Sequence, residues 1–259
     1  IIGLIISLLI SRFLGALFAS YSMYQYRMNF RLRKKDLQIF DVNMLGFILR
    51  TSLPFAAESL FFNGGKIIMQ MMIVSFGTAH IAANAIAGSW VQLAEIIPSA
   101  LATSLVPIVG QSVGRGNLND VRKLTKSFVR LGIIAIVAVD TIMLPLFPLA
   151  MKLFNPEPEM IPIIFKMYLV AFVMHGVAWC YSFVLPSALR ALGDGKFTTT
   201  VSLFSMWIFR IGAGYLIGVY LGYGLVGIFV VMTIEWAIRG AIFYRRFTSN
   251  KWMNHLELK

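Results

Sequence analysis

The chain alternates long apolar stretches with short polar ones. Each apolar stretch has roughly 20 residues or more, the length of a helix that crosses the hydrocarbon core of a bilayer. We therefore predict seven transmembrane helices, at about residues 1–26, 53–76, 80–106, 124–152, 160–189, 198–220 and 225–244. The pattern indicates an all-α, polytopic membrane protein.

Composition agrees with that class. Of the 259 residues, 58% are hydrophobic and 13% are charged, and the mean hydropathy is +0.78. Soluble domains are about 25% charged, so lipid is the main solvent of this chain. The single cysteine, Cys180, excludes a disulfide within the chain, and no Cys/His metal spacing is present.

The basic residues fall into alternate loops. The odd-numbered spans are followed by RMNFRLRKK, GRGNLNDVRK, RALGDGK and RRFTSNK, and the even-numbered spans by GTAH, FNPEPEM and GYG. Basic loops face the cytoplasm, which predicts a cytoplasmic C-terminus. Since the net charge of +12 lies in these loops, topology explains it and no nucleic-acid partner is expected.

The N-terminal residues IIGLIISLLI contain no Met and no basic region, so they do not form a signal peptide. We interpret the chain as one that is cut inside a transmembrane helix. It is therefore expected to be a fragment of a longer protein.

Two spans form a hairpin that carries ionisable residues at membrane depth, where a charge marks a substrate or ion path by default. Glu58 follows Pro54, which frees a backbone carbonyl one turn earlier. A buried carboxylate beside such a break can bind a cation, such as sodium, or exchange a proton. The alternative is that Glu58 is a structural partner of Lys66 or a helical neighbour.

Glu95 lies three residues before Pro98 on the second arm of the hairpin. At 1.5 Å per residue, Glu58 and Glu95 have similar depths of roughly 20–27 Å, so they are candidates for one shared site. The alternative is that Glu95 pairs with a cytoplasmic arginine. Lys66 needs an acid from another span, and three are available: Glu95, Asp140 and Glu235.

Later spans add Asp140, His175, Arg210 and Glu235. His175 can titrate near neutral pH, although a lone histidine is more often a hydrogen-bonded packing residue. We predict ion or proton coupling by Glu58, Glu95 and Asp140. The residues predicted to line a substrate cavity are Phe62, Asn63, Lys66, Met69, Trp90, Gln92, His175 and Trp179. Aromatic and Met side chains there suit greasy cations, and the alternative is that they face lipid.

Enzyme signatures are missing. The sequence contains no GxSxG, HExxH, P-loop or HxE…CxxC pattern, which argues against an intramembrane enzyme. We expect no cofactor beyond a sodium ion or a proton as the coupling ion.

Several stretches together resemble the C-terminal half of MATE (multidrug and toxic compound extrusion) transporters. They are PFAAESLFFN, GTAHIAANAIAGSW, PSALATSLVPIVGQSVGRGNLNDVRK, LPSALRALGDGKFTTT, WIFRIGAGYLIG and RRFTSNKW. The resemblance implies twelve spans in two six-helix bundles, with the substrate cavity between them. Residues 1–26 would then be the sixth span, 27–52 a basic cytoplasmic loop with an amphipathic helix, 53–247 the C-terminal bundle and 248–259 a cytoplasmic tail.

The resemblance also implies a function: export of organic cations and other amphipathic compounds across the plasma membrane in exchange for sodium ions or protons. Glu58 matches an acid that family members carry in the seventh span. Trp179 stands where many members have an acid in the tenth span, and Asp140 is a candidate replacement. The missing N-terminal bundle and the bilayer are the expected partners. The alternatives are a lipid-linked saccharide flippase of the same superfamily and a non-transporting membrane protein.

Overall fold

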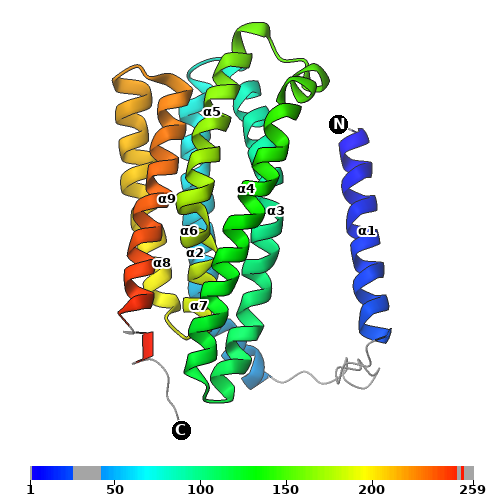
Figure 1. Ribbon diagram of the computed structural model, residues 1–259, viewed down its shortest axis with the longest axis vertical. Helices are drawn as coiled ribbons and strands as arrows, with labels where there is room; N and C mark the ends of the chain where they lie inside the picture. The colour runs from blue at the N-terminus through cyan, green and yellow to red at the C-terminus, as the bar shows by residue number, and fades with distance from the viewer. Residues whose placement is uncertain (1, 26–41, 250–251, 254–259) are drawn as a thin grey trace. The chain divides into compact units, whose positions relative to one another are not determined.

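The computed structural model describes residues 2–25, 42–249, 252 and 253, and within them the chain is helical with no strand (Figure 1). The first helices are α1 (Ile2–Gln25), α2 (Val42–Val74), α3 (Thr78–Gly114) and α4 (Leu118–Phe154). Next come η2 (Pro158–Met160), α5 (Ile161–Met174), the π-helical turn η3 (His175–Trp179), α6 (Cys180–Phe183) and α7 (Leu185–Ala191). The last are α8 (Gly195–Ser205), the π-helical segments η4 (Met206–Ala213) and η5 (Tyr215–Tyr220), and α9 (Gly224–Thr248).

The predicted fold class is confirmed. Six described helical segments are long and apolar enough to cross a membrane: Ile5–Ser22, Thr78–Gly114, Leu118–Phe154, Pro158–Ala191, Gly195–Tyr220 and Gly224–Thr248. The remaining expected span, at 53–76, corresponds to a shorter apolar helix, Ser59–Val74, within α2. The count of seven is therefore approximately correct.

One local prediction differs from the structure. We expected an amphipathic helix within residues 27–52 and a separate span at 53–76, but α2 runs from Val42 to Val74 without a break. Pro54 removes one helical hydrogen bond in this stretch, but α2 continues through it. The chain divides into two compact units within α2, Ile1–Pro54 and Phe55–Lys259. The basic loop at 27–41 and the tail at 254–259 lie outside the described residues.

The second unit is a helical bundle in which α3 packs against α4, α5 and α7, while α9 packs against α5, α6 and the π-helical segments (Figure 1). The predicted turn between the first two arms is present, and Gly77 adopts a φ of 100° there. A residue with a Cβ rarely adopts that conformation, which accounts for the glycine. The bundle brings the polar residues of α3, α4, η3 and α9 into its interior.

Candidate functional site

A cluster of ionisable side chains lies where α3, α4 and η3 meet. The Nδ1 atom of His175 is 2.7 Å from Oδ2 of Asp140, and its Nε2 atom is 3.6 Å from Oε1 of Glu95. The indole Nε1–H of Trp179 donates a hydrogen bond of 2.9 Å to the same Glu95 oxygen. We call these four residues the Asp140 cluster.

Local backbone features allow this meeting. His175 and Trp179 are the first and last residues of the π-helical turn η3, and such turns are frequent at functional sites. Gly176 lies between α5 and α6, and a Cβ there would stand 3.3 Å from Cγ2 of Val137 on α4. The absence of that Cβ lets α4 approach closely enough for Asp140 to reach His175.

The Asp140 cluster is nearly dry. The side chains of Asp140 and His175 are fully buried, whereas Glu95 keeps 21% of its side chain exposed. The phenol of Tyr168 donates a 2.6 Å hydrogen bond to the backbone carbonyl of Asp140, and the ring of Trp236 stacks on that of His175. Two buried polar atoms, Oδ1 of Asp140 and Nε2 of His175, have no hydrogen-bond partner among the described residues.

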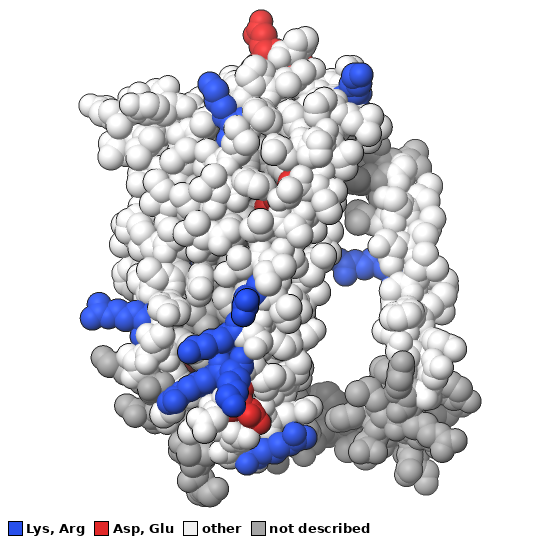
Figure 2. All heavy atoms as spheres, in the orientation of Figure 1, with Lys and Arg blue, Asp and Glu red and all other residues white. Residues whose placement is uncertain are grey.

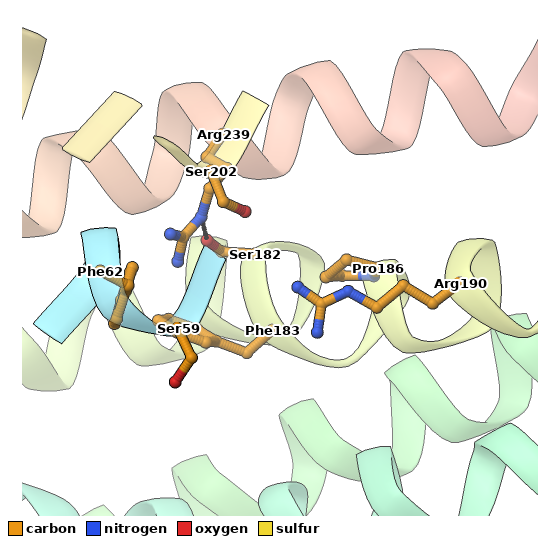
Figure 3. Close-up of a pocket in the computed structure, with 8 residues that line it drawn as sticks. All are labelled: Ser59, Phe62, Ser182, Phe183, Pro186, Arg190, Ser202 and Arg239. Carbon is orange, nitrogen blue, oxygen red and sulfur yellow. Dashed lines mark hydrogen bonds between the residues drawn. The ribbon is translucent and has the colours of Figure 1, made fainter. Parts of the chain in front are cut away.

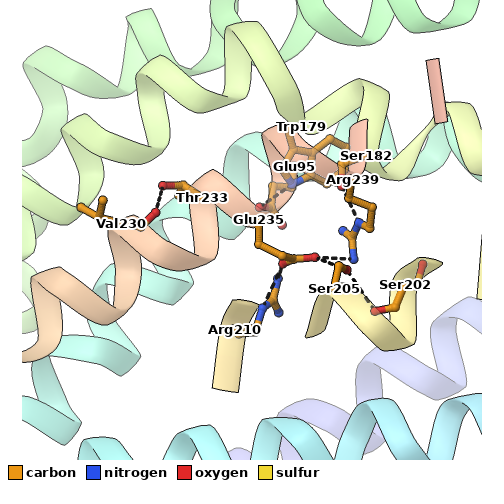
Figure 4. A network of polar contacts seen from close by, with 10 residues as sticks. All are labelled: Glu95, Trp179, Ser182, Ser202, Ser205, Arg210, Val230, Thr233, Glu235 and Arg239. Carbon is orange, nitrogen blue, oxygen red and sulfur yellow. Dashed lines mark hydrogen bonds and ion pairs between the residues drawn. The ribbon is translucent and has the colours of Figure 1, made fainter. Parts of the chain in front are cut away.

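A second polar cluster centres on Glu235 of α9 (Figure 4). Its carboxylate pairs with Arg210 of η4 at 2.5 Å and with Arg239 at 3.1 Å, and it accepts a 2.8 Å hydrogen bond from the Ser205 hydroxyl. Arg239 also donates to Ser182 at 2.7 Å. These contacts, which we call the Glu235 cluster, join η4 to α9. They also give each buried charge the partner that it needs to be stable in the interior.

A cavity of about 390 Å³ opens beside the Glu235 cluster (Figure 3). It is lined by Ser59 and Phe62 of α2, Ser182 and Phe183 of α6, Pro186 and Arg190 of α7, Ser202 of α8 and Arg239. We call it the serine–arginine cavity. A second cavity of about 390 Å³ lies between α2, α3, η4 and α9, and its lining includes Lys66, Met69, Asn84 and Arg210.

The structure places the predicted cavity residues in different environments. Phe62 lines the serine–arginine cavity, and Lys66 and Met69 line the second cavity. His175 and Trp179 are buried in the Asp140 cluster instead. Trp90 is only 8% exposed and packs edge-on against Phe147 and Tyr168 in the core. Asn63 and Gln92 are exposed and line neither of the two cavities.

Lys66 does not form the expected ion pair with an acid among the described side chains. Glu95, Asp140 and Glu235 each bind other residues, and the Lys66 ammonium instead lies 5.0 Å from the ring centroid of Phe62. Lys66 is exposed on α2, so its charge needs no buried partner. Glu58 lies in α2, but its side chain is outside the described part of the structure.

Sequence reasoning missed Arg239, Ser182 and Ser205. The available signal was the four-residue spacing between Glu235 and Arg239, which places both on one helix face. Among the described residues no group of three His, Cys, Asp or Glu side chains is arranged to hold a metal ion. On the face of the bundle in Figure 2, Lys and Arg gather mainly toward the end where α3 turns into α4.

Comparisons with known proteins agree with this architecture. The MatE family model matches residues 54–216. The chain is 23% identical over 253 residues to the uncharacterised transporter YisQ of Bacillus subtilis, covering 97% of this chain and 55% of the relative. It is 25% identical over 252 residues to the probable multidrug resistance protein NorM of Thermotoga maritima, covering 96% and 53%. The chain thus spans about half the length of the curated relatives it matches.

Solved structures share the fold. A crystal structure of MATE in the straight conformation superposes with a TM-score of 0.76 at 16% identity, over 95% of this chain and 56% of the other. A MOP superfamily transporter from Pyrococcus furiosus gives a TM-score of 0.77 at 16% identity, over 97% and 56%. At these identities the likeness concerns the fold alone.

Proposed function

Because this chain belongs to the MatE family of multi-pass membrane transporters, we propose that it supplies the C-terminal bundle of a secondary antiporter. The solutes would be organic cations or other amphipathic drugs, exported across the plasma membrane in exchange for sodium ions or protons. A second bundle, preceding this chain in the full-length protein, would complete the transport path. The match over half the length of the relatives supports that arrangement.

The observation that carries the proposal is the Asp140 cluster. Asp140 and His175 are fully buried inside helices that are long and apolar enough to cross a membrane. Ionisable groups are expensive in such a position and mark ion paths more often than they serve packing. The coupling role predicted for Glu95 and Asp140 is supported by their joint contact with His175.

The cavities lined by α2 are the proposed surface for the solute. In the serine–arginine cavity, Phe62 offers an aromatic face beside three hydroxyl groups. The ring of Phe183 is already covered by the Arg239 guanidinium at 4.5 Å and by the stacked ring of Trp179. Aromatic faces attract organic cations, and hydroxyl groups bind polar substituents in several orientations. Rocking of this bundle against the second one would open the cavity to each side of the membrane in turn.

The comparisons do not favour the flippase alternative, and the family consists of transporters rather than enzymes. The proposal concerns the whole protein, so its test needs the full-length protein.

Flux in proteoliposomes tests the proposal, with ethidium as a fluorescent cationic probe. We expect the full-length protein to accumulate ethidium against its gradient when an inward or outward gradient of protons or sodium is imposed. Collapsing the imposed gradient with an ionophore should abolish the accumulation. Ethidium movement that ignores both gradients would contradict antiport.

A further inference from the structure

The Asp140 cluster brings two carboxylates and one imidazole together from three elements. Glu95 comes from α3, Asp140 from α4 and His175 from η3. The other groups that face His175 are uncharged: Trp179 of η3 and Trp236 of α9. Tyr168 of α5 reaches Asp140 only at its backbone carbonyl. Among the described side chains, no Lys or Arg pairs with Glu95 or Asp140.

Because no described Lys or Arg side chain pairs with Glu95 or Asp140, protons are the available means of neutralising their negative charges. With His175 neutral and both acids ionised, the cluster carries two negative charges in a nearly dry interior. Burial disfavours such a state strongly. One added proton on the imidazole lowers the net charge to minus one, and a second proton on a carboxylate makes the cluster neutral. The arginines of the Glu235 cluster form ion pairs with Glu235 and do not neutralise Glu95 or Asp140.

One unpaired atom, Nε2 of His175, shows where a proton can be received. The Nε2 atom of His175 faces Oε1 of Glu95 and has no hydrogen-bond partner, while Nδ1 faces Oδ2 of Asp140. Because Nδ1 has the shorter contact, 2.7 Å to Oδ2 of Asp140, we assign the proton of the neutral imidazole to Nδ1, which leaves the Nε2 lone pair toward Glu95. Glu95, at 21% exposure, is the one carboxylate of the cluster that is not fully enclosed by the bundle, so we assign it the exchange of protons with the surroundings.

We propose that His175 is a proton carrier and that the coupling ion bound by this bundle is a proton. Glu95 takes a proton from the aqueous path and passes it to His175. The O–H bond of Glu95 breaks, an N–H bond forms at Nε2, and the resulting imidazolium lies between two carboxylates. Asp140 keeps its hydrogen bond with Nδ1–H throughout. The reverse transfer returns the proton to Glu95 and then to water.

The hydrogen bond from the Trp179 indole to Glu95 keeps the proton from passing to His175 until Glu95 moves. At 3.6 Å, Glu95 Oε1 is too far from Nε2 for a direct hydrogen bond. The indole N–H only donates, so its 2.9 Å bond holds Glu95 as an acceptor, away from His175. Transfer therefore requires Glu95 to leave Trp179 and approach His175. Trp179 is a positioning residue in this scheme.

The inference rests on the proposed antiport, and its test separates the two. The full-length protein is reconstituted in sodium-free proteoliposomes with ethidium. One assay measures uptake driven by a pH difference, and the other measures exchange of ethidium for ethidium at equal pH, which needs no net proton movement. Wild type should perform both. His175→Gln should lose the driven uptake and keep the exchange, because only the proton step needs a titratable imidazole.

A matched control is His80→Gln in the first turn of α3, which should keep both activities. Driven uptake by His175→Gln at the wild-type level would overturn the inference, as would a wild-type protein that exchanges ethidium but shows no uptake driven by the pH difference. Absence of both activities from wild type would instead overturn the antiport proposal. If His175→Gln fails to fold, Glu95→Gln replaces it with the same expected split, since this residue is partly exposed. Driven uptake by Glu95→Gln would equally refute the carrier.

Discussion

Glu235 holds two arginines inside the bundle, and this residue shows how a buried charge stabilises the fold. Its carboxylate pairs with Arg210 and Arg239 and accepts from Ser205. Glu235→Gln would leave two buried guanidinium groups without a charged partner. We expect a loss of about 3–5 kcal/mol in the free energy of unfolding. The thermal unfolding midpoint in detergent measures it, with exposed Glu157→Gln as the control that should behave as wild type.

Glu58 is the residue that the family resemblance ties most closely to coupling. In the full-length protein, Glu58→Gln should abolish ion-driven ethidium efflux while leaving expression intact. A carboxamide cannot bind or release a proton and is a weaker sodium ligand, which is the physical reason. Efflux from cells that express the variant measures the effect. Efflux at the wild-type level would remove Glu58 from the mechanism.

At this scale the sequence predicts candidates better than it predicts contacts. Glu95, Asp140 and His175 each stood out because a polar residue in an apolar span is unusual. Their meeting could not be predicted, since it depends on the rotation of α3 and α4 and on the π-helical turn η3. Hydropathy does not encode that rotation. For Lys66 the sequence predicted an acidic partner from charge alone, and among the described side chains that ion pair is not formed.

Among the elements, the spans were largely predictable and their internal irregularities were not. The expected spans at 160–189 and 198–220 correspond to the apolar segments Pro158–Ala191 and Gly195–Tyr220. The π-helical segments η3, η4 and η5 inside them have no clear mark in the sequence. The unbroken α2 was also missed, because the apolar stretch begins at about residue 53 although the helix itself begins at Val42.

The hairpin of η5 and α9 depends on a close backbone approach at Gly218. A Cβ at Gly218 would overlap Cγ1 of Ile228 and lie 3.3 Å from the carbonyl oxygen of Gly224. Gly218→Ala should therefore destabilise the bundle by about 1–3 kcal/mol through overpacking. Gly214→Ala is the matched control, since a Cβ added at Gly214 would meet nothing within 4 Å. Equal unfolding midpoints for the two variants would show that the approach at Gly218 is not tight.

For the whole molecule, the basic loops predict the orientation. A green fluorescent protein fused after Lys259 should fluoresce and an alkaline phosphatase fused there should be inactive, because the C-terminus is expected in the cytoplasm. The same two reporters fused within the α4–η2 loop, after Asn155, should give the opposite result. An active phosphatase at Lys259 would invert the topology and place the RALGDGK loop outside.

The central claim is that the cavities of this bundle belong to a path that opens to each side of the membrane in turn. Ser59 is exposed and lines the serine–arginine cavity, so it reports on that path. The direct measurement uses Ser59→Cys in the full-length protein, with Cys180→Ala and any other cysteine removed. A membrane-impermeant maleimide is applied from the cytoplasmic or the external face.

Glu157→Cys in the α4–η2 loop serves as the control, and it should be labelled from the external face under every gradient. For Ser59→Cys we expect labelling from the cytoplasmic face under one imposed ion gradient and from the external face when the gradient is reversed. Labelling from one face only, whatever the gradient, would contradict it.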